Sequence, residues 1–484
     1  MAGFRSAEEF WPNPKDLSLL PFNFERVGST GQVLISNMVG DFVRLSDQDF
    51  DRLTRLDVKS GDGLYERAYA AHLITGATQK SQKQLLALRL RSRMSFLRQA
   101  TPLHIFVVTL RCEHSCPYCQ VSRQSTDRSR FDMSEQTAMR SLDIAFQSQS
   151  KRIKIEFQGG EPLLNFDLIK TIVVEAKKRS SASGKLADFV IASNLALLDD
   201  HVLSFCKEYD ILLSTSLDGP ADLHNKNRPR PGGNSYELAV AGIRRAQSEL
   251  GPDRVGALMT TTEASLERVD EIIDEYLRLE LDGIFLRPLS PFGFAVKTKL
   301  YQRYDTEKWL AFFERGLRRI LEINRGGRPF RELYSSLLMQ RMFTDKPIGY
   351  VDLRSPAGIG LGALVYNYDG NVYASDEGRM LAEAGDKTFA LGHVSEASYR
   401  SLVLSDNLVN AVSESLSQCA PQCSNCVYES HCGADPVYHH ATQGDPVGIK
   451  PLSGFCARQK GVMSILLGML ENPEDRAILR RWIN

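Results

Sequence analysis

Hydrophobic and polar positions follow two alternating periods from residue 104 onward. Short runs rich in β-branched and aromatic residues are followed by stretches whose apolar residues recur at helical spacing. The predicted strands are His104–Leu110, Ile153–Gln158, Asp188–Asn194, Leu212–Asp218, Val255–Thr261 and Ile284–Leu289. The predicted helices include Glu135–Gln147, Asp167–Lys178, Tyr236–Leu250, Leu266–Leu279 and Glu307–Ile323. This alternation predicts an α/β fold, a partial (β/α)6 barrel of the TIM type, with its active site at the C-terminal ends of the strands.

A different pattern precedes the barrel. Short strands are predicted at Phe22–Arg26, Gln32–Asn37 and Asp41–Leu45, with turns at 28–31 and near Gly40. Helices are predicted at Asp47–Leu56 and Leu64–Thr75. A helical connection then carries basic residues and no acidic ones: Lys80, Lys83, Arg89, Arg91, Arg93 and Arg98. A solvated face explains these charges, and docking of an acidic peptide is the alternative.

Length and charge limit the functional classes. The 484 residues suffice for two or three domains, and 59 basic residues balance 59 acidic ones, so no overall field favours nucleic acid or a membrane. Residues 1–10 lack a basic segment leading into an apolar run, and no stretch of about 18 apolar residues occurs. Nine cysteines in two main groups look like metal ligands rather than a disulfide framework. We therefore expect a cytoplasmic protein.

The first cysteine group follows the first predicted barrel strand directly. Cys112, Cys116 and Cys119 lie within eight residues, with Tyr118 before the last of them. Three thiolates leave one iron of a [4Fe–4S] cluster free for a small molecule, because such clusters take four ligands. Zinc, with His114 as a further ligand, and a chance cluster of core cysteines are the alternatives.

This loop resembles the signature of the radical S-adenosylmethionine (SAM) enzymes. The resemblance implies a [4Fe–4S] cluster on Cys112, Cys116 and Cys119, with S-adenosylmethionine on the open iron and a 5′-deoxyadenosyl radical as product of its reductive cleavage. The segment Gly159-Gly160-Glu161-Pro162, after the second strand, resembles the family segment that contacts the amino group of S-adenosylmethionine. An ordinary strand-to-helix turn is the alternative explanation.

Further cofactor contacts are expected at the next two strand ends. By the same resemblance, Asn194 and Ser216 are inferred contacts of the ribose and carboxylate, and Arg228 is a candidate for the carboxylate. Arg228 could equally be an exposed charge of a proline- and glycine-rich loop. Cys206 lies in a predicted helix, where core packing explains it.

The second cysteine group comprises Cys419, Cys423, Cys426, Cys432 and Cys456, which could hold zinc or a four-cysteine cluster. It resembles the SPASM auxiliary-cluster domain of radical peptide maturases. The resemblance assigns the outer auxiliary cluster to Cys423, Cys426, Cys432 and Cys456, with Cys419 as a spare or alternative ligand. The inner auxiliary cluster cannot form, because Pro436 and Ser375 stand where cysteines are expected. We predict two clusters in all.

Ser375 follows a predicted hairpin over Tyr366–Ala374, and Asp376 comes next. In sulfatase-maturing relatives an aspartate at the matching position acts as a base toward the substrate, so Asp376 is a candidate catalytic residue. Asp376 and Glu377 could instead be exposed hairpin charges.

The resemblance covers nearly the whole chain, and the nearest subgroup is the radical maturase of His-Xaa-Ser peptide systems. It implies oxidation, with a crosslink as one outcome, of a ribosomally made peptide, and a flavodoxin- or ferredoxin-type reductant. The N-terminal strands resemble a peptide-recognition domain, and a plain barrel-capping domain is the alternative. A radical SAM enzyme acting on a small molecule and a non-catalytic iron–sulfur carrier or scaffold are the rival functions. The expected parts are residues 1–78, the basic connection 79–103, the barrel 104–325, a bridging region 326–400 and the auxiliary-cluster domain 401–484.

Overall fold

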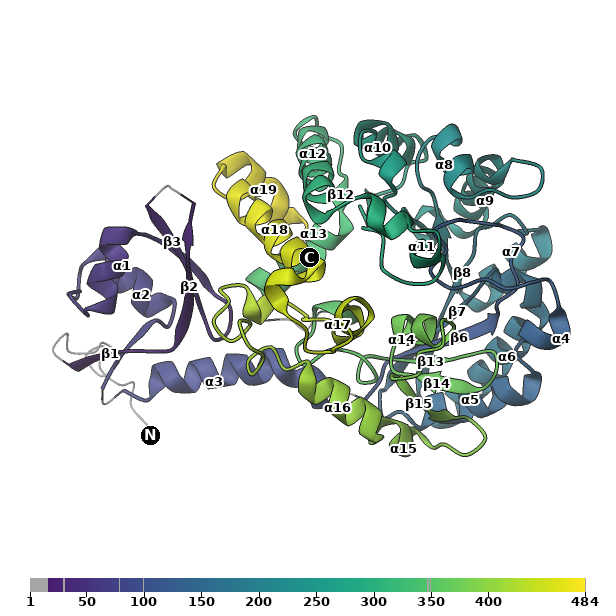
Figure 1. Cartoon of the computed structure of the whole chain (residues 1–484), viewed down its shortest axis with the longest axis horizontal. Coiled ribbons are helices and arrows are strands. Elements are labelled where there is room, and N and C mark those ends of the chain that lie inside the picture. Colours follow the sequence, from purple (N-terminus) through teal and green to yellow (C-terminus); the bar gives the residue numbers. More distant parts are fainter. Residues whose placement is uncertain are drawn as a thin grey trace.

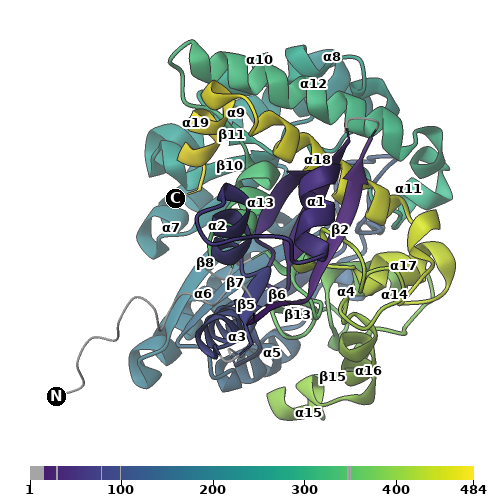
Figure 2. The same ribbon diagram turned by 90° about the vertical axis from the view of Figure 1, so that its left-hand side faces the viewer.

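The computed structural model describes residues 16–28, 31–77, 79–98, 100–345, 348 and 350–483. The first ten residues and part of the predicted turn at 28–31 lie outside this range. Figure 1 shows a small N-terminal module at one end, an α/β half-barrel at the other, and C-terminal helices between them. In the view of Figure 2, the strands of the N-terminal module lie in front of the C-terminal helices.

An eight-stranded sheet forms the centre of the half-barrel, in the order β10-β9-β8-β7-β6-β13-β14-β15. Five of its strands are the first five predicted ones: β6 (Leu103–Thr109), β7 (Arg152–Gly159), β8 (Leu186–Ala192), β9 (Leu212–Ser216) and β10 (Val255–Leu258). All five run parallel. The α/β fold class is therefore confirmed.

The sixth predicted strand, Ile284–Leu289, is wrong over most of its length. Only β11 (Gly283–Ile284) is a strand, and it pairs with β12 (Arg331–Glu332) rather than with β10. The strand ends early because the next backbone donors turn elsewhere: Leu286 N–H donates to the Glu332 side chain at 3.2 Å and Arg287 N–H donates to Phe285 O at 2.8 Å. One backbone hydrogen bond, from Thr261 N–H to Arg287 O at 2.8 Å, still joins this segment to the chain just after β10.

The predicted hairpin belongs to the same sheet. β13 (Ala363–Tyr366) runs parallel to β6 and turns through Asp369-Gly370 into the antiparallel β14 (Asn371–Tyr373), which is followed by β15 (Ala390–His393). Gly370 has φ 86°, a left-handed conformation that favours glycine in such a turn. The hairpin thus extends the barrel sheet beyond its first strand.

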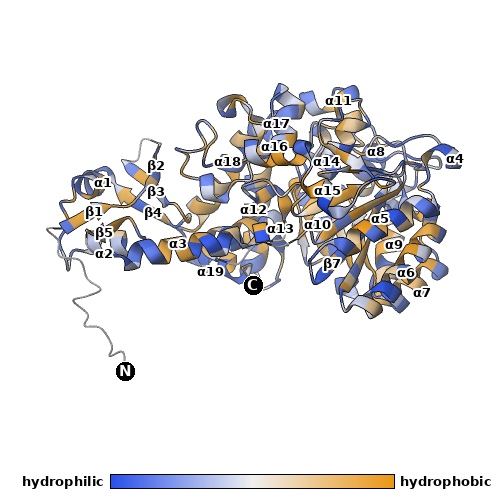
Figure 3. Cartoon of the chain, turned by 90° about the horizontal axis from the view of Figure 1, so that it is seen from below, coloured by the Kyte–Doolittle hydropathy of each residue, from blue (hydrophilic) through white to orange (hydrophobic). Residues whose placement is uncertain are grey.

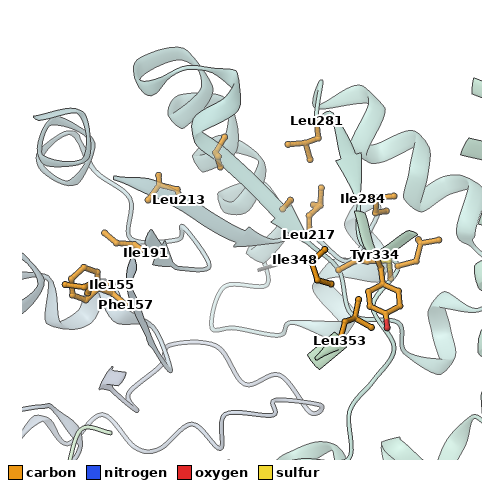
Figure 4. Close-up of a cluster of buried hydrophobic side chains, with 14 of the residues drawn as sticks. Ile155, Phe157, Ile191, Leu213, Leu217, Leu281, Ile284, Tyr334, Ile348 and Leu353 are labelled. Carbon is orange, nitrogen blue, oxygen red and sulfur yellow. The ribbon is translucent and has the colours of Figure 1, made fainter. Parts of the chain in front are cut away.

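Helices cover the outer face of the sheet, with polar and apolar residues on different sides in Figure 3. They are α5 (Glu135–Gln147), α6 (Phe166–Ser183), α7 (Asp200–Tyr209), α9 (Ser235–Leu250), α10 (Val269–Arg278) and α12 (Thr306–Arg325). The short helices α4 (Arg128–Phe131), α8 (Ala221–Asn227) and α11 (Phe294–Lys297) lie in the connections that follow strands, and α11 packs beside Tyr118. Ile155, Phe157, Ile191 and Leu213 project from neighbouring strands into the buried core shown in Figure 4. Each such burial contributes about 1.5–3 kcal/mol.

The N-terminal module has its own core. Its sheet is β2 (Phe22–Val27), β3 (Gln32–Asn37) and β4 (Phe42–Ser46), and it also contains α1 (Asp47–Thr54), α2 (Gly63–Ala70), β1 (Leu17–Leu19) and β5 (Ile74–Gly76). The helix predicted over Leu64–Thr75 ends at Ala70, because Ile74–Gly76 pairs with β1 instead.

The basic connection is α3 (Ser81–Arg93) with a short helix η3 (Met94–Arg98). Arg89 binds Asp41 through two hydrogen bonds of 2.5 and 2.7 Å and also contacts Asp345. Arg93 donates to the carbonyl of Arg341 at 2.9 Å. The prediction of a wholly solvated or peptide-docking face is therefore wrong for Arg89 and Arg93, which fix the connection to the rest of the chain.

The C-terminal half is helical and encloses the distal cysteines. Its helices are α13 (Leu333–Phe343), α14 (Asp376–Ala382), α15 (Tyr399–Val403), α16 (Asp406–Glu414), α17 (Pro436–Gln443), α18 (Gly454–Met469) and α19 (Pro473–Arg481). α18 packs on α12 and lies between the N-terminal module and the barrel (Figure 1). No helix in the described ranges has the length and apolar character needed to cross a membrane.

Candidate functional site

A cavity of about 500 Å³, the strand-end pocket, lies where β6 to β10 end. The predicted site residues that line it are Cys112, Cys116, Tyr118, Cys119, Gly159, Gly160, Asn194, Ser216, Arg228 and Asp376. Glu161 and Pro162 do not line it and are buried beside it. The fold therefore gathers ten predicted residues, from six separate segments of the chain, around one cavity.

The cysteine loop, residues 112–119, is held by backbone hydrogen bonds from other segments. Ser115 N–H donates to Pro229 O at 2.7 Å, and Phe294 N–H donates to Cys119 O at 2.8 Å. Burial raises the pKa of both the Cys112 and the Cys116 thiol. A buried thiolate needs positive charge beside it, so these two sulfurs and that of Cys119, which lines the same cavity, fit a cationic iron–sulfur core.

His114 does not require zinc to explain its position. The ligand atoms of Cys112, Glu113 and His114 lie within 4.8 Å of one another. Both ring nitrogens of His114 nevertheless have protein partners: Nδ1 lies 3.0 Å from Glu113 Oε1 and Nε2 lies 2.8 Å from Ser235 Oγ. Asn194 Nδ2 also donates to Glu113 Oε1, at 2.8 Å. This network ties the cysteine loop to the end of β8.

Gly159 and Gly160 are required because they pack closely against the backbone just before the cysteine loop. A Cβ on Gly159 would lie 2.0 Å from Thr109 O, and one on Gly160 would lie 2.3 Å from Arg111 O. Gly160 N–H donates to Thr109 O at 2.9 Å. Only glycine allows the end of β7 to approach the backbone from which the cysteine loop departs.

Glu161 faces the protein interior rather than the strand-end pocket. Its carboxylate accepts hydrogen bonds from Ser193 Oγ at 2.7 Å, Asn194 N at 2.8 Å and Leu163 N at 3.0 Å. Burial raises the pKa of Glu161 to about 8. The side chain therefore joins the ends of β7 and β8 and places Asn194 at the pocket wall. The ligand-facing part of the motif is the glycine pair.

Arg228 is neither exposed nor free. It donates to the buried carboxylate of Asp218 through Nε at 3.1 Å and Nη2 at 3.2 Å, and its guanidinium lies 5.4 Å from the centre of the Tyr118 ring. The Tyr118 hydroxyl also donates to Asp218, at 2.6 Å. The prediction of an exposed loop charge is therefore wrong. Burial is the largest influence and raises the pKa of Asp218, but the charges of Arg228 and His224 and the hydrogen bonds from Tyr118 and Arg228 together hold that pKa below its ordinary value.

Asp218 is a site residue that sequence reasoning missed. It follows β9 directly and accepts a further hydrogen bond from Thr260 N at 3.2 Å, just after β10. One carboxylate thus connects the cysteine loop to two strand ends. The available signal was an acidic residue just after an apolar strand, followed by Gly219-Pro220.

Four distal cysteines surround a second cavity of about 440 Å³, the distal cysteine cavity. Its sulfur donors come from Cys423, Cys426, Cys432 and Cys456, whereas Cys419 is exposed and does not line it. Burial raises the pKa of the Cys432 thiol to about 12, and the neighbouring thiols add to the effect. The donor set fits a cluster with four cysteine ligands.

Both positions where cysteines were expected begin helices. Ser375 Oγ accepts from Gly378 N at 3.1 Å and caps α14. Pro436 occupies the first turn of α17, and Asp435 caps that helix through Val437 N and Tyr438 N at 2.9 and 3.1 Å. Serine, aspartate and proline are the residues that helix starts favour. A local structural role thus accounts for these departures.

The acidic pair after Ser375 lies in the first turn of α14, and both residues line the strand-end pocket. The prediction that they are exposed hairpin charges is therefore wrong. Asp376 Oδ1 accepts from Nε of the fully buried Arg379 at 2.9 Å. Three further pocket residues that sequence reasoning missed are Arg287, Tyr350 and Asp352.

Comparison with known proteins finds a family match for the barrel region. Residues 106–276 match the family model of the radical SAM superfamily. An uncharacterized protein of Methanocaldococcus jannaschii is 29% identical over 188 residues, which cover 39% of this chain and 62% of that protein, less than two thirds of its length. The serine-type anaerobic sulfatase-maturating enzyme of Bacteroides thetaiotaomicron is 27% identical over 151 residues, 30% of this chain and 36% of that enzyme.

Two solved structures share the fold over most of the chain. The structure described as native anSMEcpe with bound AdoMet superposes with a TM-score of 0.63 at 16% identity, covering 78% of this chain and 100% of that one. Streptococcus suis SuiB bound to precursor peptide SuiA gives a TM-score of 0.51 at 14% identity, covering 90% and 98%. At these identities the likeness concerns the fold.

Proposed function

From the premise that residues 106–276 are the core of a radical SAM enzyme, we propose that the protein oxidatively modifies a ribosomally synthesised peptide. The observation that carries this proposal is the strand-end pocket, which places three cysteines of one loop beside Gly159, Gly160, Asn194, Ser216 and Arg228. When bound there, a [4Fe–4S] cluster and S-adenosylmethionine supply a 5′-deoxyadenosyl radical that abstracts a hydrogen atom. A non-catalytic iron–sulfur carrier would have no use for this pocket.

The chain's own residues divide the work of holding these groups. Cys112, Cys116 and Cys119 hold the cluster. Asn194 and Ser216 offer an amide and a hydroxyl to the hydroxyls and carboxylate of S-adenosylmethionine, and Arg228 offers a cation to the carboxylate. Because Asp218 already binds Arg228, the guanidinium is oriented before the ligand arrives.

A second, auxiliary cluster is part of the proposal. Cys423, Cys426, Cys432 and Cys456 hold it, and Cys419 takes no part because it is exposed outside the cavity. A cavity of about 440 Å³ favours a multi-atom cluster over a single zinc ion. No inner auxiliary cluster forms, because Ser375 and Pro436 serve as helix starts.

A peptide substrate is supported by solved structures of similar fold that contain bound peptides. SuiB has been solved with its precursor peptide, and anSMEcpe has been solved with a peptide and AdoMet. In this chain β2 is an edge strand of the N-terminal sheet, in which it pairs with β3, and its Phe24 is exposed. We propose this edge as the place where a leader peptide adds a strand. A flavodoxin- or ferredoxin-type protein is the proposed reductant.

The test is an anaerobic reaction with S-adenosylmethionine, reductant and a short peptide co-expressed with the protein. We expect release of 5′-deoxyadenosine and a peptide lighter by two hydrogens per modification. Release of 5′-deoxyadenosine with small-molecule extracts, while every candidate peptide keeps its mass, would favour a small-molecule substrate. No release from protein that carries its iron would overturn the enzyme assignment.

A further inference from the structure

A third cavity, the middle cavity, lies between the strand-end pocket and the distal cysteine cavity and shares lining residues with each. It measures about 90 Å³ and is lined mainly by aromatic and charged side chains. The residues that it shares with the strand-end pocket are Phe285, Arg287, Tyr350, Asp352 and Glu377. Gln459 lines both the middle cavity and the distal cysteine cavity. A substrate group held here would lie between the two cysteine sites.

Glu377 borders the two cavities from the first turn of α14. In the described part of the chain no ion pair joins its carboxylate to a basic side chain. Asp376, its neighbour, borders only the strand-end pocket of the two and is bound to the buried Arg379 at 2.9 Å. Taking a proton onto Asp376 would weaken the charge balance of a buried guanidinium, which is costly. Protonation of Glu377 would leave no paired guanidinium without its counter-charge.

The charges around Glu377 come from every element packed against it. Asp352 and Tyr350 approach from the segment before β13, Asp435 from the start of α17, Arg287 from the segment after β11, and Asp376 from its own helix. Burial raises the pKa of Glu377, and Asp352 and Asp376 raise it further, while Arg287 opposes them. A carboxylate shifted toward neutral pH is suited to exchange protons in catalysis.

We propose that Glu377, rather than Asp376, is the carboxylate that removes the substrate proton during peptide oxidation. This inference rests on the proposed function. The peptide loses two hydrogens: the first leaves as a hydrogen atom from carbon, as the radical chemistry requires. Glu377 takes the second as a proton from an adjacent O–H, N–H or S–H group, the freed electron pair joins a new bond to that carbon, and one electron leaves to an iron–sulfur acceptor. The carboxylic acid then returns its proton to water.

The decisive comparison is between Glu377→Gln and the wild-type holoprotein, with measurement of both 5′-deoxyadenosine and modified peptide. We expect the ratio of modified peptide to 5′-deoxyadenosine to fall by about 100-fold or more in the Gln variant, because general-base contributions are of this size. Release of 5′-deoxyadenosine itself should persist. Glu377→Asp should recover part of the ratio, and Glu396→Gln, which removes an exposed carboxylate outside these cavities, serves as the matched control.

A second readout needs neither S-adenosylmethionine nor peptide. Because the folded state raises the pKa of Glu377, its contribution to stability is present at low pH and is lost as pH rises through the folded value. The Tm of the wild-type holoprotein should therefore fall more than that of Glu377→Gln as pH rises from about 4.5, the ordinary pKa of the group, to about 7, its pKa in the folded protein. Asp352 and Asp435, whose pKa values are also raised by burial, leave a residual slope in both proteins.

The outcomes separate the two levels of the proposal. If wild-type protein releases 5′-deoxyadenosine but changes no peptide, the proposed function fails, whatever the Tm data show. If wild-type protein modifies a peptide and Glu377→Gln keeps the wild-type ratio, the role of Glu377 is overturned. If the ratio of modified peptide to 5′-deoxyadenosine falls in Asp376→Asn but not in Glu377→Gln, Asp376 rather than Glu377 removes the substrate proton.

Discussion

The two cysteine sites are built in opposite ways. The first takes all its sulfurs from one loop, residues 112–119, which distant segments hold in place: Ser115 N–H donates to Pro229 O, Phe294 N–H donates to Cys119 O, and the Tyr118 hydroxyl donates to Asp218. The distal site takes its sulfurs from a loop and from the start of α18, and the N-terminal module packs against it. Asn23 Nδ2 donates to Cys426 O at 3.0 Å, and His431 Nε2 lies 2.8 Å from Gly40 O. The first site thus has local ligands and remote support, whereas the second is assembled from remote parts.

The largest effects, and the clearest difference between the two sites, are expected from removing one cysteine sulfur from each. Cys116→Ser should abolish release of 5′-deoxyadenosine, because the first cluster has only three protein ligands. Cys423→Ser should preserve that release but prevent accumulation of modified peptide. Iron content and 5′-deoxyadenosine yield measure the two effects. Equal loss of 5′-deoxyadenosine in both variants would mean that the sites do not act separately.

The remote support of the first site is tested by Asp218→Asn. This change leaves the largely buried Arg228 without its charge partner and should lower the free energy of unfolding by about 3–5 kcal/mol. Affinity for S-adenosylmethionine should also fall, since Arg228 and Tyr118 lose their common anchor. Denaturant unfolding and equilibrium binding measure these effects. Asp222→Asn, at an exposed ion pair with Arg268, is the control and should change stability by under about 1 kcal/mol.

A smaller effect is expected from Gly160→Ala. The added methyl would meet Arg111 O and force the end of β7 away from the cysteine loop. A loss of about 1–3 kcal/mol is the usual size for such a backbone conflict. Thermal unfolding and iron content at the first site measure it. Gly468→Ala is the control, because a Cβ on this helical glycine of α18 meets no neighbouring atom, so stability and iron content should change little.

Cys419→Ser should have the smallest effect. Its side chain lies outside the distal cysteine cavity, so iron content, 5′-deoxyadenosine yield and peptide modification should stay at wild-type levels. Loss of about four irons per chain would instead show that Cys419 is a ligand.

Local sequence patterns predicted most of the barrel. The strands that begin near His104, Ile153, Asp188, Leu212 and Val255 are present within a few residues, because apolar runs bounded by turns are self-contained signals. The sixth strand was predicted too long, because the N–H groups of Leu286 and Arg287 bond to the Glu332 side chain and to Phe285 O rather than to a neighbouring strand. The junction of the hairpin with β6 was missed, since pairing between strands so far apart in sequence leaves no local trace.

The sequence by itself determined the ligand chemistry, because cysteine spacing within a loop limits what can bind there. It also indicated the glycine pair, whereas the helix starts at Ser375 and Pro436 emerged only from the structure. Only the tertiary structure decided the direction in which side chains face. It turned Glu161 inward, bound Arg228 to Asp218, paired Asp376 with Arg379 and left Glu377 beside two cavities. Those choices depend on packing between segments hundreds of residues apart, which no short pattern records.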